Sequence, residues 1–187
     1  GWSWFKGMAS NQWVSMNILE GFARMRSLGI PLDNNEVHTM QVKAIAYLDR
    51  IMVQRRKSAP DGNLSYYDIC YLDVRSSYTD IPLAGETLDC HKGMVEKLKQ
   101  WVHFSTIEKA YAATALYRYG FADIAREIVA SLRQYAVTSP DKGMFWPNNR
   151  ASYRYSNSAV VEQCALIEAF TLVDPVTTEI DAMRHWL

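Results

Sequence analysis

The triplet Asp89-Cys90-His91 has the side-chain types of a nucleophilic site. A histidine beside a thiol can lower the pKa of that thiol and activate it. Adjacent residues on a helix point in different directions, however, and a catalytic Cys–His pair normally meets in space rather than along the chain. We therefore expect this triplet to carry no chemistry.

Glutamates on apolar segments form a second candidate. Glu162 and Glu168 lie on one apolar stretch, and Glu20 occupies the position that matches Glu168 in an earlier stretch. Carboxylates that point into an α/α barrel, close to tryptophans, would suit glycoside hydrolysis. We favour a simpler role, in which each glutamate accepts hydrogen bonds from loop backbone at a helix end. The tryptophans in question are Trp2, Trp4 and Trp146, and we expect them mainly to wedge helices and pin loops.

The remaining polar residues show no spacing typical of a metal or cofactor site. The histidines lack metal-ligand spacing, and the cysteines contain no Cys-x-x-Cys pair. Two states of the three cysteines are equally consistent with the sequence. In the first, two of them form a disulfide and the third is a free thiol, and in the second, all three are reduced. We assign no catalytic, cofactor-binding or metal-binding residue. The histidines are His38, His91, His103 and His185, and the cysteines are Cys70, Cys90 and Cys164.

The composition is that of a folded, neutral protein. The chain has 187 residues, of which 49% are hydrophobic and 21% charged, and its formal net charge is +0. A neutral chain offers no electrostatic reason to bind nucleic acid or an anionic membrane. The one tight basic cluster, Arg55-Arg56-Lys57, stands at an expected helix end, where cations suit the helix dipole. We expect neither nucleic-acid binding nor direct membrane insertion.

A repeated unit organises the elements that position these residues. Gly1–Gly29 is a tryptophan-rich loop followed by an apolar helix, and 143–173 is a degenerate copy. In this copy Trp146 matches Trp4, and the segment LIEAF ending at Phe170 matches ILEGF ending at Phe22. A loop-plus-helix unit that returns after intervening helices is typical of a helical repeat or toroid.

Apolar periodicity and capping signals predict helices along nearly the whole chain and almost no strand. Gly29 ends the first helix, Ser105 and Glu108 form a capping box, and Asp174-Pro175 begins the last helix. The residues from 137 to 155 are expected to form a loop. The expected helices span 11–28, 34–57, 64–76, 87–103, 105–119, 121–136 and 157–173, with one more after Pro175.

The character of these helices predicts an all-α fold with two layers. The stretches 11–28, 105–119 and 157–173 are almost entirely apolar, whereas 34–57, 87–103 and 121–136 have one polar side. Apolar inner helices surrounded by half-exposed outer ones favour an α/α toroid, either a small complete ring or part of a larger one. We expect residues 1–187 to form a single α/α domain excised from a larger protein.

The opening residues resemble the thioester-containing region of bacterial alpha-2-macroglobulin-like proteins, whose domain is a terpenoid-cyclase-like α/α toroid. Weaker similarity extends to a later helix pair of that domain. The opening likeness rests on Gly1-Trp2-Ser3-Trp4-Phe5, Ser10-Asn11, Ile18-Leu19-Glu20-Gly21-Phe22 and Leu28-Gly29. The later likeness rests on Asn148, Ser156-Asn157 and Glu168-Ala169-Phe170.

The resemblance implies a non-catalytic domain of a protease inhibitor. In this family a bait segment is cut, and the protein then changes shape and entangles the protease. The implied partners are target proteases and other domains of the parent chain, and the implied location is the periplasm or cell surface. Many members carry a thioester within Cys-Gly-Glu-Gln, but this motif is absent here, so no thioester residue is assigned.

Two other functions remain open. A carbohydrate-active or terpenoid-cyclase-like α/α enzyme would require two or more carboxylates that face one cleft, with Glu20, Glu162 or Glu168 among them. A helical-repeat protein-binding module would use the hairpin of residues 110–136, although the apolar inner helices suit an open concave face poorly. The inhibitor-domain interpretation is our main expectation.

Overall fold

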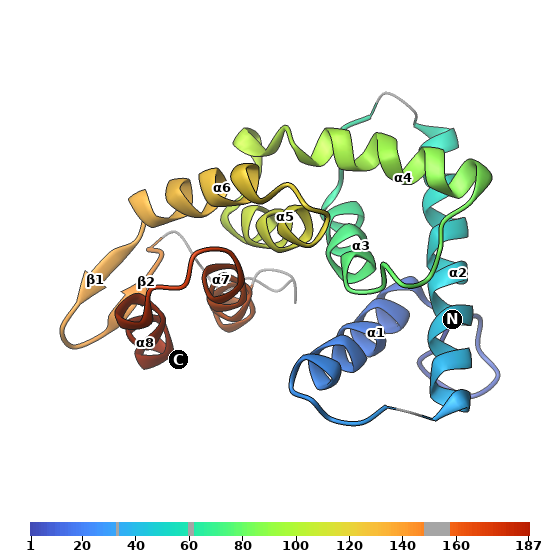
Figure 1. Ribbon diagram of the computed structural model, residues 1–187, viewed down its shortest axis with the longest axis horizontal. Helices are drawn as coiled ribbons and strands as arrows, with labels where there is room; N and C mark the ends of the chain where they lie inside the picture. The colour runs from blue at the N-terminus through green and yellow to red at the C-terminus, as the bar shows by residue number, and fades with distance from the viewer. Residues whose placement is uncertain (33, 60–61, 148–157) are drawn as a thin grey trace. The chain divides into compact units, whose positions relative to one another are not determined.

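The computed structural model describes residues 1–32, 34–59, 62–147 and 158–187. Within them the chain forms eight α-helices, one 3-10 helix and a two-stranded hairpin (Figure 1). The predicted all-α class is therefore confirmed. The described chain divides into two compact units, residues 1–97 and 98–187. Asn148 and Ser156-Asn157, which contribute to the family resemblance, lie outside the described residues.

The first unit contains four helices, and the first three begin at the polar N-caps Asn11, Asn34 and Ser65. Asn11 Oδ1 accepts hydrogen bonds from the backbone amides of Trp13 and Val14, at 2.9 and 3.1 Å. The Ser65 and Asp68 side chains form a capping box at the third helix. The helices are α1 Gln12–Ser27, α2 Asn35–Ser58, α3 Tyr66–Ser76 and α4 Gly85–Leu98, the last residue of which falls in the second unit.

Helix α3 is the most buried helix of the first unit, because every residue from 68 to 76 is buried. Several of its polar side chains bind other groups of the first unit. Tyr71 Oη donates to Asp49 Oδ1 on α2 at 2.7 Å, and Arg75 Nε lies 3.3 Å from the same oxygen. Arg75 Nη2 donates to the Ile81 carbonyl at 2.6 Å, and Tyr78 Oη donates across to the Leu19 carbonyl of α1, also at 2.6 Å. This network ties α1, α2 and α3 together.

The second unit combines a helical core with a hairpin. Gly120, at φ +89°, allows the tight turn between α5 and α6, and both pack with α7. The hairpin pairs Val137 with Phe145 and Ser139 with Gly143, and it packs on α8 (Figure 1). The elements are η1 Trp101–His103, α5 Thr106–Arg118, α6 Ala122–Gln134, β1 Val137–Ser139, β2 Gly143–Phe145, α7 Ala159–Val173 and α8 Thr177–Trp186.

Most expected boundaries agree with the structure within a few residues, and four details differ. The helix expected over 87–103 ends at Leu98, and Trp101–His103 forms a separate 3-10 helix. The last helix begins at Thr177 after an N-cap at Val176, and not at Pro175. The loop expected after residue 136 contains the β1–β2 hairpin. Helix α1, expected to be buried all round, fully buries only Ser15, Met16 and Leu19. Helix α5, in contrast, buries residues on nearly every side, as expected.

No helix in the described ranges is both long enough and apolar enough to cross a bilayer.

Candidate functional site

A pocket of about 330 Å³ lies between α2 and α4 in the first unit. Asp89 and Cys90 of the candidate triplet line it, together with Met94, whereas His91 does not. The pocket also has a charged rim, which consists of Arg56, Lys57, Glu86 and Lys97.

The cations of this rim bind groups of the chain itself. Arg56 Nη2 lies 2.7 Å from Asp68 Oδ2, and Arg56 Nη1 donates to the Gly62 carbonyl at 2.9 Å. Lys97 Nζ donates to the same carbonyl at 2.8 Å, and Lys57 forms an ion pair with Glu86. The rim charges therefore hold the end of α2 to α3 and α4.

The Cys90 thiol is set up for packing rather than for nucleophilic attack. Its Sγ lies 3.9 Å from Met94 Sδ, and burial raises its pKa, so it is protonated at neutral pH. Burial also lowers the pKa of His91 to about 4, with a smaller contribution from the Arg75 charge. At neutral pH the imidazole is uncharged and supplies no cation that would favour a thiolate.

Arginines neutralise two of the three candidate glutamates. Glu20 Oε1 lies 2.6 Å from Arg24 Nη2, one turn further along α1. Glu168 Oε1 on α7 accepts a hydrogen bond from Arg118 Nη2 on α5 at 2.7 Å. The sequence analysis expects loop backbone groups as the hydrogen-bond donors to these glutamates, and it names neither Arg24 nor Arg118 as a partner.

Glu162 has a different environment. Burial raises its pKa to about 7, and its buried Oε1 has no hydrogen-bond partner among the described residues. Glu168 stands six positions further along the helix, which places the two side chains about 120° apart around the α7 axis. Glu162 and Glu168 are therefore not arranged as a carboxylate pair on one face of this helix.

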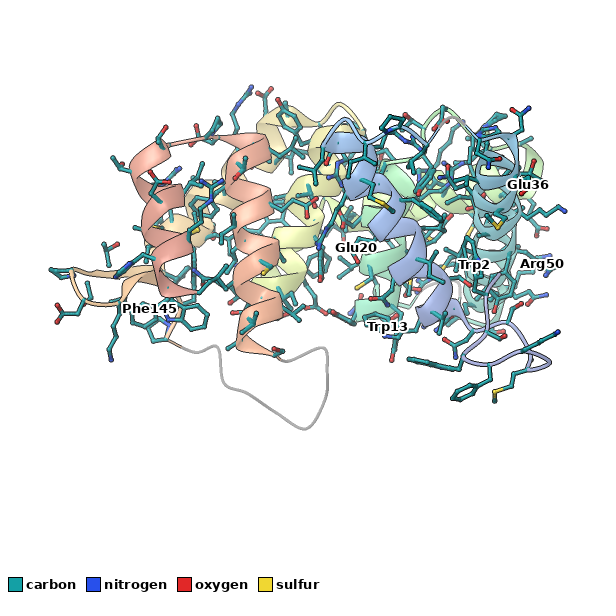
Figure 2. The ribbon with its side chains drawn as sticks, turned by 90° about the horizontal axis from the view of Figure 1, so that it is seen from below. Trp2, Trp13, Glu20, Glu36, Arg50 and Phe145 are labelled. Carbon is teal, nitrogen blue, oxygen red and sulfur yellow. The ribbon has the colours of Figure 1, made fainter. Side chains whose placement is uncertain are left out.

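The aromatic loop of residues 1–10 is anchored to α1 and α2. The Trp2 amide donates to Ser15 Oγ at 2.8 Å, and the Asn11 amide donates to the Trp2 carbonyl at 2.7 Å. Tyr47 Oη on α2 donates to the Ser10 carbonyl at 2.7 Å. The centroid of the Trp2 ring, which is labelled in Figure 2, lies 6.3 Å from that of the Phe22 ring.

The second aromatic segment is anchored in a corresponding way. Gln163 Nε2 on α7 donates to the Met144 carbonyl at 2.8 Å. Trp146 Nε1 donates to the Leu132 carbonyl of α6 at 2.9 Å, and its ring meets the Phe170 ring edge-on at 5.7 Å. The preceding residue, Phe145, which is labelled in Figure 2, stacks on the ring of Trp186 in α8.

These contacts support the repeat that the sequence predicts. Ser15 stands three residues before the ILEGF segment and Gln163 three before LIEAF, so they occupy matching positions. Both are buried, and each bonds to the backbone of the residue after a glycine, Trp2 or Met144. Sequence reasoning missed both residues, although their equal offset from the matched segments is a usable signal.

The tryptophans matched by sequence differ in their surroundings. Trp146 is 4% exposed, whereas Trp4 is 62% exposed. In the first unit it is Trp2, and not Trp4, that lies against the phenylalanine of the following helix. The sequence match between Trp4 and Trp146 is therefore one of position and not of environment.

The structure also describes the cysteines and the residues that could bind a metal ion. None of the three cysteines, Cys70, Cys90 and Cys164, all of them in the described ranges, forms a disulfide. In the described part of the chain, no group of three histidine, cysteine, aspartate or glutamate side chains is placed to hold a metal ion. Comparison of the sequence with models of known protein families and with curated proteins finds no match.

Proposed function

We propose that this chain is a non-catalytic helical domain of a bacterial alpha-2-macroglobulin-like protease inhibitor. In this proposal both units belong to one α/α domain, in which the helices follow the order of a terpenoid-cyclase-like toroid. The parent protein would act in the periplasm or at the cell surface. Its partners would be target proteases and the other domains of the same chain.

The observation that carries the proposal is the repeated anchoring of an aromatic segment to the helix that follows it. The Ser15–Trp2 hydrogen bond lies within the first copy and the Gln163–Met144 hydrogen bond within the second. The two bonds involve matching positions of their copies. Repeated loop-plus-helix modules are the elements from which a helical ring is built. The opening residues that resemble the inhibitor family belong to the first of these modules.

The buried polar contacts favour a scaffold over a catalyst. Asp49, Tyr71 and Arg75 bind one another and the backbone within the first unit. The Cys90 thiol, protonated at neutral pH, is a poor nucleophile. Such contacts rigidify a domain, which suits a part that must hold the closed state of a larger protein.

The proposal is tested on the full-length protein that carries this chain. The purified protein is mixed with a protease of broad specificity and followed by native electrophoresis and gel filtration. Trapping predicts that cleavage changes the mobility of the protein and that the protease elutes with it. The isolated chain serves as the control and should neither change mobility nor retain the protease. A parent protein that is cleaved without retaining the protease would contradict the proposal.

A second candidate is a glycan-processing α/α enzyme, and the state of Glu162 favours it. A carboxyl with a pKa of about 7 can act as a general acid near neutral pH. This function requires a second carboxylate at the same cleft. A panel of polysaccharides incubated with the chain tests it: hydrolysis that disappears in Glu162→Gln would support the enzyme, and absence of hydrolysis would exclude it for those substrates.

A further inference from the structure

Gly93 keeps a space open in the pocket between α2 and α4. It lines the pocket from the interior of α4, where glycine is less favourable than alanine or leucine. A Cβ atom added at Gly93 would meet no atom of the surrounding described structure within 4 Å, so close packing does not require the glycine. Its φ is not positive, so the backbone conformation does not require it either. The effect of the missing side chain is to leave the pocket open.

The interior of this pocket is apolar and has the size of a small-ligand site. Val53 and Cys90 line it together with Met94, and the side chains of Val53 and Met94 belong to the buried core of the first unit. Its volume of about 330 Å³ lies at the lower end of the range of ligand pockets, about 300–1,000 Å³. The space therefore suits one compact apolar group.

The rim of the pocket carries charges of both signs at the N-terminal end of α4. Glu86 and Asp89 are three positions apart on this helix and so lie on one face. Lys57 Nζ of α2 lies 2.5 Å from Glu86 Oε1, and both of these side chains are exposed (Figure 1 shows α4 beside the end of α2). Asp89 is also exposed, and within the described residues its carboxylate has no ion-pair or hydrogen-bond partner.

These charges leave two places for a ligand to bind. A cation can lie beside Asp89, which no described cation neutralises. An exposed ion pair contributes little to stability, and an ammonium group has three N–H donors. Lys57 can therefore bind a second anion while it remains close to Glu86. The ligand that complements this rim carries an ammonium group and a carboxylate together.

We propose that this pocket binds a free α-amino acid with a large apolar side chain, such as leucine, methionine or phenylalanine. The ammonium group of the ligand binds Asp89 and its carboxylate binds Lys57, so that charges alternate in sign from Asp89 through the ligand to Lys57 and Glu86. The apolar side chain of the ligand enters the pocket over Gly93. The proposal does not depend on the protease-trapping function, and either can fail without the other.

Isothermal titration calorimetry of the chain with L-phenylalanine tests the proposal. We expect binding at one site, with a dissociation constant in the millimolar range or below. N-acetyl-L-phenylalanine lacks the ammonium charge and L-phenylalaninamide lacks the carboxylate, and each should bind at least about tenfold more weakly because one charge-assisted bond is lost. Glycine has both charges but no side chain, and it should bind more weakly for want of apolar contact.

Three variants locate the site. Gly93→Leu should fill the pocket and abolish binding, while circular dichroism shows that the helices remain, since leucine favours a helix. Gly21→Leu is the matched control: Gly21 lies on α1, away from the pocket, and a Cβ atom there also meets no atom within 4 Å. It should leave the affinity unchanged. Asp89→Asn should weaken L-phenylalanine at least about tenfold.

Four results would overturn the proposal. The first is the absence of binding by phenylalanine, leucine and methionine at millimolar concentrations. The second is equal affinity for L-phenylalanine and its N-acetyl derivative, which would make this a site for apolar anions. The third is equal affinity for L-phenylalanine and its amide, which would make it a site for apolar cations. The fourth is unchanged binding in folded Gly93→Leu, which would place the ligand elsewhere.

Discussion

The side-chain amide of Gln163 donates a hydrogen bond of 2.8 Å to the main-chain carbonyl of Met144. The same nitrogen donates to the Met183 carbonyl at 3.0 Å, so one buried residue of α7 fixes both strand β2 and helix α8. Ser15 has the corresponding role in the first unit, where its hydroxyl holds the backbone of Trp2. In each module a buried polar side chain thus determines where the aromatic segment lies on its helix.

Replacement of Gln163 by alanine should destabilise the second unit. The Met144 and Met183 carbonyls lose a donor inside the protein, which costs about 2–3 kcal/mol of unfolding free energy. Urea denaturation monitored by circular dichroism measures the change. Gln54→Ala, at an exposed position of α2, is the control and should change stability by less than about 0.5 kcal/mol. Equal effects of the two variants would contradict the anchoring role.

Truncation of Trp146 should lower the stability of the chain much more than truncation of Trp4. Trp146→Ala removes a buried indole and its bond to Leu132, and we expect a loss of about 3–5 kcal/mol. Trp4→Ala removes an exposed side chain, so the isolated chain should lose less than about 0.5 kcal/mol. Thermal unfolding of both variants makes the comparison. A large loss for Trp4→Ala would show that Trp4 is part of the core.

Gly143 should tolerate no side chain. Its φ of +71° disfavours other residues, and a Cβ atom there would clash with the Ala182 carbonyl of α8. Gly143→Ala should therefore cost more than about 2 kcal/mol. Gly120→Ala is the matched control, because Gly120 has a φ of +89° but a Cβ atom added to it would meet no other atom within 4 Å. Its cost should be about 1–2 kcal/mol, from conformation alone.

Glu162 should make stability decrease as the pH rises. Burial raises its pKa from 4.5 to about 7 in the folded state, so the folded chain binds an extra proton between these values. The contribution of Glu162 to the free energy of unfolding is complete below about pH 4.5 and is lost as the pH rises through 7. We expect a loss on the order of 1 kcal/mol, since the group is partly exposed and water screens it.

Denaturant midpoints at pH 5 and pH 8 test this prediction. Glu162→Gln should reduce the difference between the two midpoints and stabilise the chain at pH 8. Glu127→Gln, at an exposed position of α6, should leave the difference unchanged. If Glu162→Gln and the unsubstituted chain had the same pH dependence, the burial of this carboxyl would be refuted.

His91 should make stability decrease as the pH falls, in contrast to Glu162. Burial lowers its pKa from 6.5 to about 4, so the unfolded chain binds the extra proton. Its contribution is complete above pH 6.5 and is lost as the pH falls towards 4, on the order of 1 kcal/mol by pH 5. The pKa is read directly from the imidazole proton resonances during an NMR titration. A His91 pKa near 6.5 in the folded chain would contradict this prediction.

Most helices could be predicted because their ends carry local signals. Gly29 and the box of Ser105 and Glu108 act within a few residues, and the structure retains both signals. The box at Ser65 was missed because aspartate, Asp68, takes the place of the usual glutamate. The hairpin was missed because two three-residue strands are too short to show alternation.

Burial and ion pairing could not be predicted in the same way, because they depend on residues far apart in the chain. Arg118 and Glu168 are separated by 50 positions, and only packing of α5 on α7 brings them together. Helix α3 carries Asp73 and Arg75, whose charged side chains usually face water, yet both are buried. The repeated tryptophans were recognised from the sequence, whereas the exposure of Trp4 depends on three-dimensional contacts.

The most direct test of the proposed function is the ratio of two activities of a protease incubated with the full-length protein that carries this chain. A trapped protease still cleaves a small chromogenic peptide but cannot reach a large protein substrate. The proposal predicts that peptide cleavage is retained while cleavage of the large substrate falls severalfold. Equal activities on both substrates, with and without the protein, would contradict it.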